Sequence, residues 1–167
     1  MSAAAATGSV PARSYTLGQI FLHWSMAALV IWQFVFGESM RALEHPTGAD
    51  STELLLANSH IWVGFAILGL VALRIALRFM HGAPPPEEPN RAAAVLARAA
   101  HAAFYALLVM MPVTGILDYY VHLPTGGIHE LGKPLFIGLI ALHVAAAAWH
   151  QFIRRDGTLR RILAPAR

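Results

Sequence analysis

Histidine is the side chain best suited to chemistry in this sequence, which contains nine histidines, nine acidic residues and no cysteine. Without cysteine, disulfides, thiolate metal sites, iron–sulfur clusters and covalent c-type haem attachment are excluded. His129, His143 and His150 follow one another at intervals of 14 and seven residues. On an α-helix these intervals return to within about 40° and 20° of one face. A single helix is therefore predicted to present a column of imidazoles, which can bind metal or carry protons.

The elements that carry these histidines are predicted to cross a membrane. Of the 167 residues, 57% are hydrophobic and only 13% are charged, against about 25% charged in soluble domains. A bilayer core about 30 Å thick needs roughly 20 apolar residues of helix, and four segments qualify, at about residues 17–36, 59–79, 99–121 and 128–152. The expected fold is all-α, an integral membrane four-helix bundle over residues 15–163. A flexible segment, 1–14, precedes it and a short tail, 164–167, follows it.

The basic residues predict how this bundle is oriented. Two of the twelve, Arg41 and Lys133, fall at one end of the predicted spans, and the other ten fall at the opposite end. Since Lys and Arg accumulate on the cytoplasmic side, both termini are expected in the cytoplasm, with the bundle in the inner (cytoplasmic) membrane. The positive net charge then indicates contact with anionic lipid rather than with nucleic acid.

Depth in the membrane predicts which histidines meet. His23 lies about 9 Å from the cytoplasmic start of its span, and His143 about 13 Å from the cytoplasmic end of its own. His60 and His129 both open their spans on the outer side. Two His–His pairs are therefore expected, separated along the bundle by about 20 Å.

A haem iron with two axial histidines is the cofactor that best fits two imidazoles from facing helices. Zinc is disfavoured because it takes four ligands, often including cysteine or carboxylate. The alternative is a proton relay, because intramembrane histidines also serve proton transfer. That alternative would make the chain a haem-free, proton-coupled membrane protein.

Other polar residues near the cytoplasmic end have two interpretations each. Arg74 and Arg78 either neutralise haem propionates or extend their charged ends to lipid phosphate. His150 either hydrogen-bonds a quinone carbonyl or is a plain interfacial histidine, and His101 is either structural or a neighbour of the inner haem. Pro134 lies five residues after His129, which predicts that His129 sits on a separate turn or a kinked segment.

Several short motifs, in this order along the chain, resemble the bacterial cytochrome b561 family. They are His23-Trp24, then His60 with Gly64 and Arg74, the loop Pro84-Pro85-Pro86, His101, the segment Met111 to Gly115, His129-Glu130, Leu142-His143 and His150. The resemblance covers about residues 15–163. It implies a four-helix bundle with two b-type haems, His23 and His143 holding the inner one and His60 and His129 the outer one.

The resemblance also implies electron exchange with ubiquinone. One branch of the family is similar to superoxide oxidase, which takes electrons from superoxide at the periplasmic face and passes them to ubiquinone. Superoxide oxidation is therefore the expected reaction. The alternative is a cytochrome that oxidises quinol and passes electrons to a periplasmic partner.

Overall fold

The computed structural model describes residues 14–44, 48–85, 88 and 90–165. Across these ranges all regular structure is helical. Four helices are long and apolar enough to cross a membrane, Leu17–Leu43, Ser51–His81, Arg91–Tyr119 and Gly126–Arg154. The prediction of an all-α fold with four membrane-spanning helices is therefore confirmed. Most of the segment 1–14 and the last two residues lie outside the described residues.

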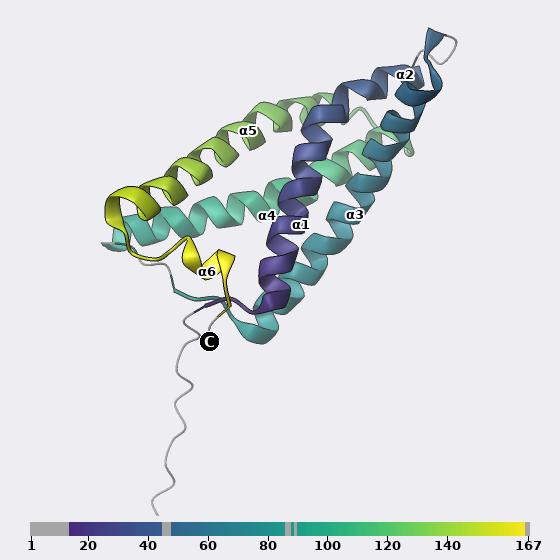
Figure 1. Ribbon diagram of the computed structural model, residues 1–167. Helices are drawn as coiled ribbons and strands as arrows, with labels where there is room; N and C mark the ends of the chain where they lie inside the picture. The colour runs from purple at the N-terminus through teal and green to yellow at the C-terminus, as the bar shows by residue number, and fades with distance from the viewer. Residues whose placement is uncertain (1–13, 45–47, 86–87, 89, 166–167) are drawn as a thin grey trace, which may run out of the picture.

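The helices form two antiparallel pairs, α1 along α3 and α4 along α5 (Figure 1). We call the end where α1 begins and α6 lies the terminal end, and the end with the α1–α3 and α4–α5 connections the loop end. At the terminal end the indole of Trp24 donates to the Ile162 carbonyl at 3.0 Å, which holds α6 beside α1. The elements are α1 Leu17–Phe36, η1 Gly37–Met40, α2 Arg41–Glu44, α3 Ser51–His81, α4 Arg91–Tyr119, α5 Gly126–Trp149, a π-helical turn His150–Arg154 and α6 Arg160–Leu163.

Helices α3 and α4 each begin eight residues before the predicted spans. Asp50 caps α3 through the backbone N–H groups of Thr52 and Glu53, and Asn90 caps α4 through that of Ala93. Such caps fix helix starts that lie before the predicted membrane spans. In consequence His60 does not open its helix but lies nine residues, about 14 Å, inside it.

Helix α5 runs without interruption from Gly126 to Trp149 and contains Pro134. The prediction that His129 sits on a separate turn is wrong. Proline removes one N–H and so frees a single carbonyl four residues earlier, here that of Glu130, which is exposed. His129 therefore stays in register with His143 on one continuous helix.

The core lies midway along the bundle, between the levels of the predicted histidine pairs. Phe136 stands seven residues from both His129 and His143 on α5, is buried, and packs edge-on against Phe34 and Phe104. The outward side chains are apolar as well, as lipid contact requires: Phe79 is 85% and Trp62 70% exposed. The buried residues of the core are Met26, Val30, Ile67, Val71, Leu108 and Phe136.

Candidate functional site: two histidine pairs

The structure brings four of the predicted site histidines together in two pairs. His23 of α1 faces His143 of α5, with ring centroids 6.3 Å apart. His60 of α3 faces His129 of α5, also with ring centroids 6.3 Å apart. Each pair joins the α1–α3 hairpin to the α4–α5 hairpin, and all four residues are partly buried.

The seat of His129 is built by one short segment of α4. The His129 Nδ1–H donates to the Met111 carbonyl at 2.8 Å, and the Thr114 hydroxyl lies 3.3 Å from the same nitrogen. Gly115 lets the ring approach the helix, because a Cβ there would stand 3.3 Å from His129 Cε1. This explains the segment Met111 to Gly115 in physical terms. The bond at Nδ1 leaves the Nε2 lone pair available, as is usual for histidines that bind metal.

His60 is held through its backbone. The Gln33 amide donates to the His60 carbonyl at 3.0 Å. Gly37 leaves room beside the ring, since a Cβ there would reach His60 Cε1 at 3.5 Å. Within the described residues, His60 Nδ1 and Gln33 Oε1 are both buried and have no hydrogen-bond partner. Buried polar atoms are rarely unpaired, so these two atoms are expected to have a hydrogen-bond partner, such as a water or a bound group, when the site is filled.

At the terminal end a third histidine joins the pair. The His143 ring lies between those of His23 and His101, whose centroid is 6.0 Å from that of His143, and Phe104 packs edge-on against it at 5.2 Å. His101 is exposed, and its Nδ1–H donates to the Ala97 carbonyl at 2.7 Å. His101 is thus a neighbour of the pair.

Arg74 contacts this pair directly. Its Nη2 points at His23 Nδ1 from 3.4 Å, and its Nη1 donates to the Gln19 carbonyl at 3.3 Å. Gln19 itself is buried, forms the capping box of α1 with Thr16 and donates to the Gly82 carbonyl. The Arg74 guanidinium is therefore fixed by both helices of the first hairpin, whereas Arg78 is exposed.

His150 lies in a cluster of charges that the sequence analysis missed. Its Nδ1–H donates to Asp156 Oδ2 at 2.6 Å, and its Nε2 is 3.4 Å from Glu88 Oε1. Arg154 reaches both carboxylates, at 3.1 and 3.8 Å. His150 is buried and opens the π-helical turn, an irregularity frequent at functional sites.

Asp156 is ionised at neutral pH. Burial raises its pKa, but hydrogen bonds from Thr158 and His150 outweigh burial and lower the pKa to about 2. The contact between Asp156 and His150 could have been predicted from the sequence, because the segment Asp156-Gly157-Thr158 directly follows the helix that carries His150. Glu88 could not be found in this way, because it lies 62 residues from His150 in the sequence.

The two basic residues of the loop end share one carboxylate. Glu38 pairs with Lys133 at 2.7 Å and with Arg41 at 2.9 Å. Lys133 follows His129 by four residues and so lies on the same face of α5. Two cations thus meet one carboxylate locally, near the His60–His129 pair, although the loop end as a whole carries six acidic residues to these two basic ones.

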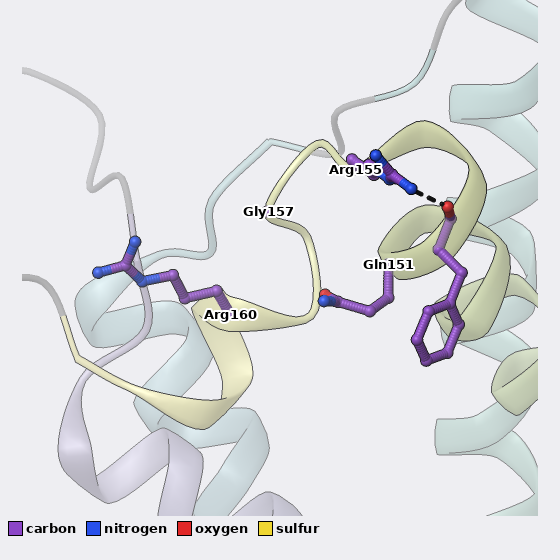
Figure 2. A pocket seen from close by; sticks show the side chains of 5 residues that line it. Gln151, Arg155, Gly157 and Arg160 are labelled. Carbon is purple, nitrogen blue, oxygen red and sulfur yellow. Dashed lines mark hydrogen bonds between the residues drawn. The ribbon is translucent and has the colours of Figure 1, made fainter.

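Open pockets are found at both ends of the bundle, and their linings do not include the candidate histidines. One, of about 440 Å³, is formed at the turn after the π-helix by Gln151, Phe152, Arg155, Gly157 and Arg160 (Figure 2). The other, of about 510 Å³, lies at the loop end and includes Glu38, Arg41 and Glu53.

The spacing of the imidazoles fits a single metal between each pair. A metal–imidazole bond of about 2.0 Å on each side, plus about 1.1 Å from each nitrogen to its ring centre, requires about 6.2 Å between centroids. Both pairs show 6.3 Å. His101 stands 6.0 Å from His143 by the same measure, but it is exposed, whereas the four paired histidines are partly buried. Across residues 14–44, 48–85, 88 and 90–165 no three acidic, His or Cys side chains are grouped to hold a metal ion. The donor set therefore suits a haem iron, which needs only two axial ligands.

Comparison with known proteins identifies the family of this chain. Residues 14–165 match the family model described as prokaryotic cytochrome b561. Cytochrome b562 of Cereibacter sphaeroides is 29% identical over 153 residues, which cover 90% of this chain and 96% of the relative.

Two enterobacterial relatives match over a similar extent. The probable superoxide oxidase CybB of Yersinia pestis is 25% identical, with 90% of this chain and 96% of the relative covered. Cytochrome b561 homolog 1 of Escherichia coli is 27% identical, with 87% and 94% covered. The chain belongs to the prokaryotic cytochrome b561 family, and is thus a multi-pass bacterial membrane protein of electron transfer whose family membership implies haem b.

Proposed function

We propose that this protein holds two haem b groups, one between His23 and His143 and one between His60 and His129. The observation that carries the proposal is the equal ring separation of 6.3 Å at two levels of one bundle. A haem iron with two histidine ligands carries one electron by cycling between its ferric and ferrous states. The protein's part is to hold the imidazoles, to exclude water with the Phe136 core, and to set the electrostatics.

We further propose that the terminal end faces the cytoplasm and the loop end the periplasm. The charge asymmetry supports this orientation, because of the ten basic residues that the structure describes only Arg41 and Lys133 lie at the loop end. Electrons enter from a donor at the loop end and are delivered to ubiquinone in the membrane at the terminal end.

The reaction we assign is superoxide oxidation. Two superoxide anions lose one electron each and become two dioxygen molecules, and ubiquinone takes up the two electrons with two protons to form ubiquinol. The likeness to a probable superoxide oxidase supports this assignment. So does the local positive excess of Arg41 and Lys133 over Glu38 near the His60–His129 pair, because local positive charge attracts a small anion.

His150 is the residue we assign to the quinone. Asp156 accepts the hydrogen bond from Nδ1–H, so Nε2 is the nitrogen from which the doubly protonated imidazole can donate a proton. Glu88 lies against Nε2 and, with Arg154 and Asp156, connects the imidazole to the terminal surface. The cluster can therefore replace a proton that leaves Nε2. Arg78, which is exposed at this end, remains our candidate for a contact to the propionates of the haem there. The Arg74 guanidinium is already directed at His23 Nδ1 and the Gln19 carbonyl.

The second candidate function is electron transfer from quinol to a periplasmic protein. It is favoured by the acidic side chains of the loop end, where Glu38 and Glu53 line the 510 Å³ pocket. A basic partner would dock there by charge complementarity.

The decisive experiment counts haems and then supplies electrons. Purified wild-type protein should contain two haems b per chain by reduced-minus-oxidised spectra. H23A and H60A should each lose one haem, and H101A, the matched control, should keep both. A colourless but folded wild-type protein would refute the haem proposal in favour of the proton-relay alternative.

A pulse of superoxide then tests the reaction. It should reduce the haem bands within mixing and yield ubiquinol when ubiquinone is present. Haem bands that stay oxidised after superoxide but are reduced by ubiquinol would overturn the proposed direction and select the second candidate.

A further inference from the structure

The two histidine pairs differ in the surroundings of Nδ1, the ring nitrogen that points away from the proposed iron, in His129 and in His23. At the loop end, His129 Nδ1–H donates to the Met111 carbonyl oxygen at 2.8 Å. At the terminal end, His23 Nδ1 faces Nη2 of the Arg74 guanidinium at 3.4 Å. One ligand thus sits against the negative end of a backbone dipole and the other against a full positive charge.

These surroundings act in opposite directions on a bound iron. A hydrogen bond from Nδ1 to a carbonyl makes the imidazole a more basic ligand and favours the oxidised metal. A nearby cation favours the state with one positive charge fewer, which is the reduced metal. Both effects raise the reduction potential of the terminal end relative to the loop end.

Other charges at the two ends do not cancel this difference. Lys133 lies on the His129 face of α5, but Glu38 binds it at 2.7 Å and both side chains are substantially exposed. Arg74 is partly buried and anchored on the Gln19 carbonyl. In the part of the chain that the structure describes, no carboxylate forms an ion pair with it.

We propose that the positive charge of Arg74 against His23 gives the His23–His143 site the higher reduction potential of the two. This inference rests on the proposed function, because it requires a haem at each pair. In consequence, a single electron shared between the two sites is found mainly at the terminal end, on the side of His150. The surroundings of the histidine ligands then favour electron transfer from a periplasmic donor toward the quinone.

Equilibrium redox titration of the purified holoprotein, followed at the haem bands with chemical mediators, tests this inference without any turnover. In the wild type we expect two one-electron transitions. H60A, which keeps the terminal-end pair, should retain the higher one, and H23A should retain the lower one. The opposite assignment would overturn the proposal, and this result does not depend on whether an Arg74 variant folds.

The second arm removes the charge itself. In R74Q the equilibrium constant that favours the electron at the terminal end should fall at least tenfold, with two haems still bound. R74K, which keeps the charge, should retain most of the preference. R98Q, which removes an exposed guanidinium from the same end of the bundle, should change the constant by less than twofold.

The outcomes separate the inference from the proposed function. Fewer than two haems in the wild type would refute the proposed function. Two haems whose potentials in R74Q are unchanged from the wild type, or a terminal-end potential that rises in R74Q, would refute only the role of Arg74.

Discussion

Substitution of Gly115 is the most direct test of how the His129 ring is held in the His60–His129 pair, which we call the outer pair. Replacing it with alanine would put a Cβ 3.3 Å from Cε1 and 3.4 Å from Nδ1 of His129, closer than the 3.5–4.0 Å of optimal carbon contacts. The ring must then move a few tenths of an ångström from α4. Its bond to the Met111 carbonyl, now 2.8 Å, would lengthen toward the limit of about 3.2 Å for a good N–H···O bond.

The expected effects on stability and on cofactor binding have opposite signs. Alanine in a helix interior is favoured over glycine by about 1 kcal/mol, so the helix itself gains. Disturbing the support of a metal ligand typically costs 10–100-fold in affinity, so we expect about tenfold faster haem loss from the outer pair in G115A and more in G115V. Gly138 is the matched control, because nothing lies within 4 Å of a Cβ at that position.

The assay is haem release to an excess of a haem-binding scavenger, followed at the haem bands, with haem content per chain as the starting value. G138A should release haem like the wild type while unfolding at a higher temperature. If G115A and G115V both release haem no faster than G138A, the His129 ring is not seated against Gly115 and the geometry argued for the outer pair fails.

Two further predictions concern the ends of the bundle. Asp156 has a pKa lowered from 3.8 to about 2. Its contribution to the free energy of unfolding is therefore present above about pH 4 and is lost as the pH falls from about 4 to 2; solvent screening leaves about 1 kcal/mol. D156N should lower the thermal midpoint at neutral pH and flatten its fall between pH 4 and 2, and an equal fall in wild type and D156N would contradict the ion pair with His150. E38Q releases Lys133 and Arg41 and should speed haem reduction by superoxide about two- to threefold at low ionic strength, an effect that salt removes. A slower reaction in stopped-flow mixing would argue against attraction of an anion at this end.

Much of the fold could be predicted because lipid imposes simple requirements. The span at residues 17–36 coincides with α1, Leu17–Phe36, since its apolar run ends where the helix changes to η1. The starts of α3 and α4 were placed eight residues late, because hydropathy detects the part of a helix that lies in lipid. The preceding caps, Asp50 and Asn90, fix the starts of these helices before the predicted spans.

The pairing of histidines could be predicted from the sequence for a related reason. Helical periodicity fixes the shared face of His129 and His143, and depth in a bilayer restricts which partners each can meet. The contacts at Nδ1 of His129 and of His23 could not be predicted from the sequence. The Met111 carbonyl lies 18 residues from His129 and the Arg74 guanidinium 51 residues from His23, so these contacts depend on tertiary packing alone.

The position of the two pairs also bears on how the bundle holds together. Within lipid the hydrophobic effect supplies no driving force between helices, and association depends on close packing and polar contacts. The buried core is small, and both imidazole pairs span the interface between the α1–α3 and α4–α5 hairpins. Ligands bound between these imidazoles would therefore connect the hairpins above and below Phe136. The residues that would bind the cofactors are thus also the residues through which cofactor binding would stabilise the fold.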